Sequence, residues 1–137
     1  MIEARQRVMS TVGRYGCYFL SIVRAAEKIT NSRIDAVKIY CDATQAKFMD
    51  SDCFIVQPDR VLKMMTGIQW NVRHDSVKYK PLEKEVMIMR YEVTRTGVTY
   101  SHFVLCAHDG SVEYDPYGNS STVRDGKPVS SRVFSHV

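Results

Sequence analysis

The chain has 137 residues, of which 45% are hydrophobic and 25% charged, a composition typical of one globular domain over residues 1–137. Its net charge of +4 comes from scattered basic residues, which does not favour nucleic-acid binding. No apolar stretch is long enough to span a bilayer. The charged start, residues 1–7, is not typical of a secretory signal, so we expect a cytoplasmic protein.

The first half of the chain has helical periodicity. Helices are expected over residues 3–11, 17–30, 34–49 and 58–66. The second is the clearest, because its apolar residues recur at spacings of three and four with polar residues between them. Asn31-Ser32 ends this helix, Asp50-Ser51-Asp52 ends the next, and Pro58 begins the last.

The second half alternates with a period of two, as strands do. Strands are expected over residues 70–74, 85–94, 100–107, 111–114 and 129–134. In the longest of these, the side that carries Met87, Met89, Tyr91 and Val93 should face the core. Asp-Gly pairs at 109–110 and 125–126 predict hairpin turns. Helices followed by an antiparallel meander predict an α+β fold.

Among the four cysteines, Cys17 has the position expected of a nucleophile. It follows Gly16 at the start of an expected helix, where the positive end of the helix dipole favours a thiolate. Cys41, Cys53 and Cys106 are expected to be buried apolar residues. No CxxC pair, histidine pair or glycine-rich phosphate loop is present in the sequence, so we expect no metal and no cofactor.

A thiolate nucleophile needs a base, and His102 is the best placed of the four histidines. It lies near the start of an expected strand, and Asp115 follows it by 13 residues across the 109–110 turn. Residues equally far from a hairpin turn lie close together, and Asp115 is within two residues of the position expected opposite His102. We therefore expect Asp115 to hold the imidazole, with Pro116 ending the strand.

Three segments in this order carry a family resemblance: residues 15–20 (Tyr-Gly-Cys-Tyr-Phe-Leu), 102–105 (His-Phe-Val-Leu) and 109–116, which ends in Asp-Pro. The chain resembles the papain-like cysteine peptidases, in particular the bacteriocin-processing, double-glycine type. The resemblance implies a papain-like fold with N-terminal helices packed on a C-terminal antiparallel sheet. It also implies a peptidase or amide hydrolase with Cys17 as nucleophile, His102 as base and Asp115 as orienter.

Two positions depart from that family. Its oxyanion-hole glutamine stands about six residues before the cysteine, where this chain has Thr11, and the one upstream glutamine is Gln6. Tyr18 stands where the family has a glycine. Gln6 is thus a candidate oxyanion donor, and losing such a donor costs roughly 10²–10³ in rate. The alternative is a catalytically inactive papain-like domain that binds a protein or peptide, of a size suited to phage or plasmid proteins.

Two other hypotheses stay open. Asp52-Cys53 paired with His102 resembles cell-wall peptidases whose nucleophile lies in Asp-Cys-Ser-Gly, although Ser-Gly is absent here and Pro58 interrupts the helix that the motif needs. A basic module for nucleic acid is the last hypothesis. Under the papain-like hypothesis, five tyrosines would line a groove for an extended peptide: Tyr15, Tyr18, Tyr100, Tyr114 and Tyr117.

Overall fold

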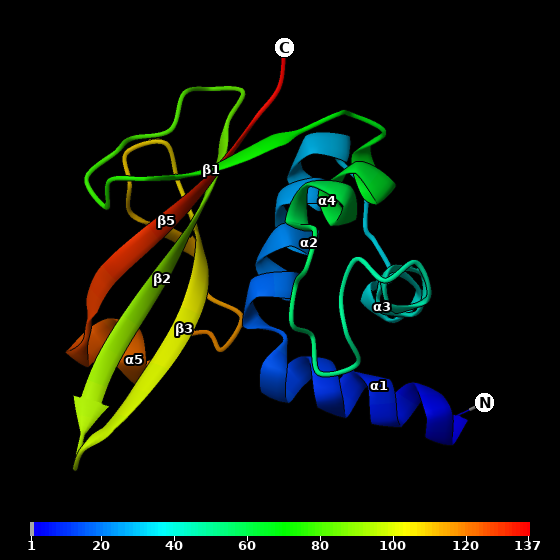
Figure 1. Cartoon of the computed structure of the whole chain (residues 1–137), viewed down its shortest axis with the longest axis horizontal. Helices are drawn as coiled ribbons and strands as arrows, with labels where there is room; N and C mark the ends of the chain where they lie inside the picture. The colour runs from blue at the N-terminus through cyan, green and yellow to red at the C-terminus, as the bar shows by residue number, and fades with distance from the viewer. Residues whose placement is uncertain (1) are drawn as a thin grey trace. The chain divides into compact units, whose positions relative to one another are not determined.

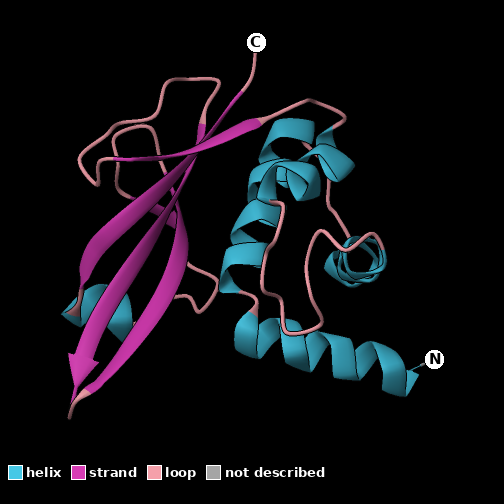
Figure 2. Ribbon diagram, viewed as in Figure 1, coloured by secondary structure: helices cyan, strands magenta, loops and turns pink. Residues whose placement is uncertain are grey.

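The structure, a computed structural model, describes residues 2–137, with side chains from Glu3 onward. It divides into two compact units that meet in sequence between Trp70 and Asn71. The first unit holds the long helices and the second holds the strands (Figure 2). This order of elements confirms the predicted α+β class.

Within the described residues, the N-terminal unit has four helices (Figure 1): α1 (Ile2–Tyr15), α2 (Cys17–Thr30), α3 (Ala36–Gln45) and α4 (Pro58–Thr66). The second and fourth have the predicted bounds. The third is shorter than the predicted 34–49, because the Asp35 carboxylate caps it by accepting the Val37 N–H. It ends before Lys47, whose φ of 63° is incompatible with a helix.

A single residue, Gly16, separates α1 from α2. Its N–H donates to the Val12 carbonyl oxygen at 2.8 Å, as in the last turn of a helix, and its carbonyl oxygen accepts the Leu20 N–H at 2.7 Å, as in the first turn of the next. The chain changes direction at Gly16 itself, whose φ of −98° and ψ of 24° are not helical. A Cβ at position 16 would lie 2.4 Å from that same oxygen, closer than real Cβ atoms approach. The sharp junction therefore requires glycine, and it explains why a new helix, with a new positive end, begins at Cys17.

The C-terminal unit is built on an antiparallel sheet of five strands in the described residues, in the order β1-β5-β2-β3-β4. Its elements are β1 (Asn71–Asp75), β2 (Val86–Arg95), β3 (Val98–Cys106), β4 (Val112–Tyr114), α5 (Ser121–Asp125) and β5 (Lys127–Ser135). Only β2-β3-β4 is a meander. The last strand returns to lie between β1 and β2, so the predicted simple meander was wrong.

The second predicted hairpin, at Asp125-Gly126, was also wrong. A short helix, α5, ends within this pair, since Asp125 is its last residue and Gly126 its C-cap. It is capped at its start by the Ser120 hydroxyl, which accepts the Thr122 N–H. At Gly126 a Cβ would lie 2.2 Å from the Glu92 carbonyl oxygen, so the glycine allows close backbone approach to β2. The Asp-Gly pair marks the end of a helix here, where the hairpin rule predicts a two-residue turn.

The predicted core face of β2 is confirmed at Met87 and Met89, which are buried with Val104 and Val133 from the neighbouring strands. The first half of β2 is also buried on its other face, at Val86 and Ile88, and the next four residues, 90–93, are all half-buried. The predicted alternation between a buried and an exposed face was therefore wrong for this strand.

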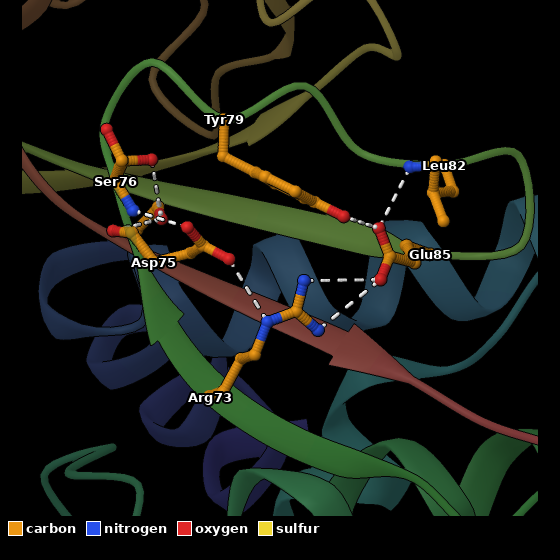
Figure 3. Close-up of polar contacts among 7 residues, drawn as sticks. Arg73, Asp75, Ser76, Tyr79, Leu82 and Glu85 are labelled. Atoms are coloured by element: carbon orange, nitrogen blue, oxygen red, sulfur yellow. Dashed lines mark hydrogen bonds and ion pairs between the residues drawn. The ribbon is translucent and has the colours of Figure 1, made fainter.

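The connection from β1 to β2 is tied down by Arg73 (Figure 3). Its guanidinium lies 3.1 Å from Asp75 and 3.3 Å from Glu85, and the Tyr79 hydroxyl donates to Glu85 at 2.5 Å. Burial would raise the pKa of Glu85, but the hydrogen bonds from Tyr79 and the Leu82 N–H and the charge of Arg73 together hold it below its ordinary value. The network fixes a ten-residue connection that has no strand or helix of its own.

Candidate catalytic site

The C-terminal unit contains a buried imidazole–carboxylate pair. His102 lies in β3, opposite Tyr91 of β2, and its side chain is 2% exposed. The Asp115 side chain, just after β4, is 5% exposed. His102 Nε2 and Asp115 Oδ1 are 2.6 Å apart. The contact predicted from the hairpin spacing is therefore present.

A tight turn places the carboxylate. The Gly118 N–H donates to the Asp115 carbonyl oxygen at 2.8 Å, with Pro116 in the position that proline favours in such turns. The turn aims two backbone N–H groups at the carboxylate: that of Tyr117 lies 2.8 Å from Oδ1, and that of Ser120 lies 3.0 Å from Oδ2. With the imidazole, these give the carboxylate three donors, which suits a buried anion.

The charge of this carboxylate decides the tautomer of the histidine. Burial raises the pKa of Asp115, but hydrogen bonds from His102 and from the Ser120 and Tyr117 amides outweigh burial, so its pKa lies below the ordinary value. An ionised carboxylate only accepts hydrogen bonds. His102 Nε2 must therefore carry a proton, and in the neutral ring the lone pair is on Nδ1.

Nδ1 of His102 is buried and has no hydrogen-bond partner. Among the residues the structure describes, it is the only buried side-chain nitrogen or oxygen in that condition. Leaving a buried polar atom unsatisfied costs about 1–3 kcal/mol, so such atoms are rare unless they have a use. A neutral imidazole with one nitrogen fixed by a carboxylate and the other presenting a lone pair is the arrangement of a general base.

Tyr117 acts on this pair in a way that its predicted place in a peptide groove does not include. Its ring stacks on the imidazole, with centroids 4.5 Å apart and an interplanar angle of 18°. Tyr117 thus holds the carboxylate with its amide and covers the imidazole with its ring, while its side chain keeps about half of its surface exposed. The Asp-Pro-Tyr-Gly turn sequence is the signal that places it.

Cys17 belongs to the N-terminal unit, where it is the first residue of α2. Its side chain is half-buried, and its carbonyl oxygen accepts the hydroxyl of Ser21, which is fully buried, at 2.8 Å. Gly16, the residue before α2, makes no side-chain cap. The predicted position at a helix N-terminus is confirmed, and the positive end of the helix dipole lies at this residue.

The other cysteines differ from Cys17. Burial raises the pKa of the Cys53 thiol to about 11, with the charges of Asp50 and Asp52 adding to the effect. Burial likewise raises the pKa of the Cys106 thiol to about 12. Cys41 is exposed, so its predicted burial was wrong. A thiol that stays protonated at neutral pH is a poor nucleophile, which argues against pairing Cys53 with His102.

Gln6 lies on the exposed surface of α1, among Glu3, Arg7 and Ser10. Nine helical residues separate it from the end of α1, a rise of about 14 Å along the helix axis. Because α1 is continuous, no loop brings Gln6 back toward Cys17. The structure therefore gives no support to Gln6 as an oxyanion donor.

Within residues 2–137, no group of three or more histidine, cysteine and acidic side chains is arranged to hold a metal ion. No helix of the same residues has the length and apolar character needed to cross a membrane.

Comparison with protein-family models matches residues 1–136 to a family described as "Protein of unknown function, DUF261". The match extends over both units. No curated protein and no solved structure matches the chain.

Proposed function

The chain belongs to the DUF261 family, and we propose that it is a papain-like cysteine hydrolase that cleaves a peptide, isopeptide or side-chain amide bond. The observation that carries the proposal is the buried His102–Asp115 pair, whose free ring nitrogen, Nδ1, lacks a hydrogen-bond partner. The position of Cys17 at the start of α2, where the helix dipole favours a thiolate, supports it as the nucleophile of the proposal.

In the proposed reaction, His102 Nδ1 accepts the thiol proton of Cys17, and the thiolate attacks the substrate carbonyl. Asp115 stabilises the imidazolium that forms and keeps the ring in position. The imidazolium then protonates the leaving amine, which leaves an acyl-thioester on Cys17. Water, deprotonated by the same imidazole, hydrolyses this thioester and regenerates the thiol. The positive end of α2 favours the negative charge that develops in both steps.

Alkylation with iodoacetamide tests the pairing of Cys17 with His102. We expect Cys17 to react at neutral pH, well before Cys53 and Cys106, whose thiols have pKa values of about 11 and about 12. The rate should follow the fraction of thiolate, so its pH profile should move to higher pH in His102→Ala, which lacks the base. Peptide mapping by mass spectrometry identifies the labelled residue.

His108→Ala is the matched control. His108 is exposed, and its Nδ1 lies 3.3 Å from the Pro81 carbonyl oxygen. Removing its ring should therefore leave the pH profile of Cys17 alkylation unchanged. If the Cys17 profile is the same in wild type, His102→Ala and His108→Ala, the two residues do not form a catalytic pair. Hydrolysis is then assayed on a peptide library, with Cys17→Ser as the inactive reference.

A second candidate is a domain of the same kind that binds a peptide without cleaving it. It is favoured by the position of Gln6 on the exposed face of α1 and by Tyr18 in place of a glycine. The two candidates differ in one result: the binding module retains its biological activity in Cys17→Ala, whereas the hydrolase loses it.

A further inference from the structure

The N-terminal unit contains a groove that the proposed chemistry does not use. It has a volume of about 690 Å³ and lies between α1 and the segment that leads into α3. Its apolar lining, called the floor here, includes Met9, Val12, Leu20, Ile34 and Val37, and the polar residues that line it are Arg5, Asp35 and the exposed Arg33.

The walls of this groove are fixed. Arg5 binds the Asp35 carboxylate through two hydrogen bonds of 3.0 and 3.2 Å, which joins α1 to the start of α3. The Ile34 N–H donates to the Glu27 carboxylate at 3.0 Å, which holds the same segment to α2. A groove with fixed walls does not have to be ordered when it binds a ligand, which favours binding.

The same unit also displays an acidic and apolar loop, residues 50–56. Phe54 and Val56 are 69% and 56% exposed, and Asp52 beside them is exposed. Large apolar side chains this exposed on an ordered loop are candidates for contact with another molecule.

The loop is held in a single conformation. The Asp50 carboxylate accepts the N–H groups of Asp52 and Phe54 at 2.9 and 3.0 Å, and the Tyr40 hydroxyl donates to the Ser51 carbonyl oxygen at 2.6 Å. Cys53 adopts a φ of 65°, a conformation that non-glycine residues seldom adopt and that costs free energy. The loop therefore presents Phe54 without a large loss of entropy on binding.

The loop and the groove are complementary. Apart from Arg5 and Asp35, which pair with each other, the groove offers an apolar floor and the basic Arg33, and the loop offers apolar side chains with the acidic Asp52 beside them. From Arg5 to Gly13 the groove follows α1 for about 12 Å, and the segment from Asp52 to Val56 spans at most about 13 Å. Since Phe54 stays exposed and the groove stays open within one chain, the loop does not fill the groove of its own chain.

We propose that the groove binds the 50–56 loop of a second copy of this chain, with Phe54 on the apolar floor and Asp52 near Arg33. In this arrangement the loop of one copy fills the groove of the next, so the contact is head-to-tail and leaves a free loop at one end and a free groove at the other. The protein then associates in steps as its concentration rises.

Sedimentation equilibrium of paired variants tests this arrangement. Phe54→Ser removes the side chain that docks, and Met9→Glu puts a charge on the groove floor at a side chain that is 57% exposed, so both variants should fold. Each variant alone should be monomeric, with association weakened about tenfold or more. A mixture of the two should form dimers and nothing larger, because one intact loop meets one intact groove.

Charge reversal and a remote control complete the test. Arg33→Glu and Asp52→Arg should each weaken association, and the double variant should recover it in part. Leu82→Ser, which changes a side chain that is 66% exposed in the other unit, should have no effect. A wild type that is monomeric at every concentration overturns the proposal. So does association that Phe54→Ser leaves unchanged, or a variant mixture that stays monomeric.

Discussion

Asp115→Ala should be among the most destabilising substitutions in the C-terminal unit. The carboxylate accepts three hydrogen bonds, from His102 Nε2 at 2.6 Å, the Tyr117 N–H at 2.8 Å and the Ser120 N–H at 3.0 Å. Its removal leaves both imidazole nitrogens without a partner in a buried site. A donor left without its acceptor in a buried site costs about 1–3 kcal/mol, so the loss of three hydrogen bonds predicts a decrease of roughly 3–5 kcal/mol in the free energy of unfolding.

Asp115→Asn removes the charge of the carboxylate and keeps the shape of the side chain. The amide oxygen can still accept from His102 and Tyr117, while the amide nitrogen faces the Ser120 N–H, a donor against a donor. The loss should therefore be smaller, about 1–3 kcal/mol. Urea denaturation followed by far-ultraviolet circular dichroism measures both values. Glu83→Gln, a change at an exposed carboxylate in the same unit, is the control and should stay within about 0.5 kcal/mol of wild type.

The pH dependence gives a second measurement of the same interaction. The pKa of Asp115 is lower in the folded chain than its ordinary value of 3.8. The carboxylate therefore stabilises the fold above that value, and its contribution is lost as the pH falls through the folded pKa. The difference in stability between wild type and Asp115→Asn should be constant near neutral pH and should narrow in acid. An Asp115→Ala variant within about 1 kcal/mol of wild type at neutral pH would refute this reasoning.

Substitutions at four further positions test other parts of the structure by the same denaturation assay. Gly16→Ala should lower the free energy of unfolding by about 1–3 kcal/mol, because the new Cβ would lie 2.4 Å from the Val12 carbonyl oxygen. Gly13→Ala should raise it by about 0.5–1 kcal/mol, because no atom lies within 4 Å of a Cβ at that position of α1. Equal effects at the two glycines would contradict the close approach. Tyr117→Ala should cost about 1 kcal/mol more than Tyr117→Phe, which keeps the stacked ring, and equal losses would show that the stack contributes nothing. Glu85→Gln should destabilise the fold above the ordinary pKa of a carboxyl and have less effect in acid, since the pKa of Glu85 is lowered; an effect that grows in acid would contradict the assigned hydrogen bonds.

The local elements of the fold were predictable from the sequence. The bounds of α2 follow from apolar spacing, and Asn31 ends it in a left-handed conformation with φ of 52°. The His102–Asp115 contact was predictable for a similar reason, because a hairpin with a marked turn fixes which residues meet.

Long-range features were not predictable in the same way. The insertion of β5 between β1 and β2 depends on pairing with residues about 60 positions away in β1 and about 35–50 positions away in β2. Hydrophobic periodicity carries no information on which strands pair. Asp125-Gly126 has the sequence of a hairpin turn, but the capping hydroxyl of Ser120 favours a short helix before it. The role of Tyr117 follows from the turn that holds Asp115, which no pattern of polar and apolar residues encodes.

The need for stability does not by itself explain the His102–Asp115 pair. A buried ion-forming pair contributes little net free energy, and apolar residues of similar volume often stabilise a fold as well or better. Here the cost is higher still, because Nδ1 is buried without a hydrogen-bond partner. The chain nevertheless builds a proline turn, two aimed amides and a stacked tyrosine around the pair. That arrangement orients a ring nitrogen more tightly than packing requires, which is what proton transfer at Nδ1 needs and what a purely structural histidine does not.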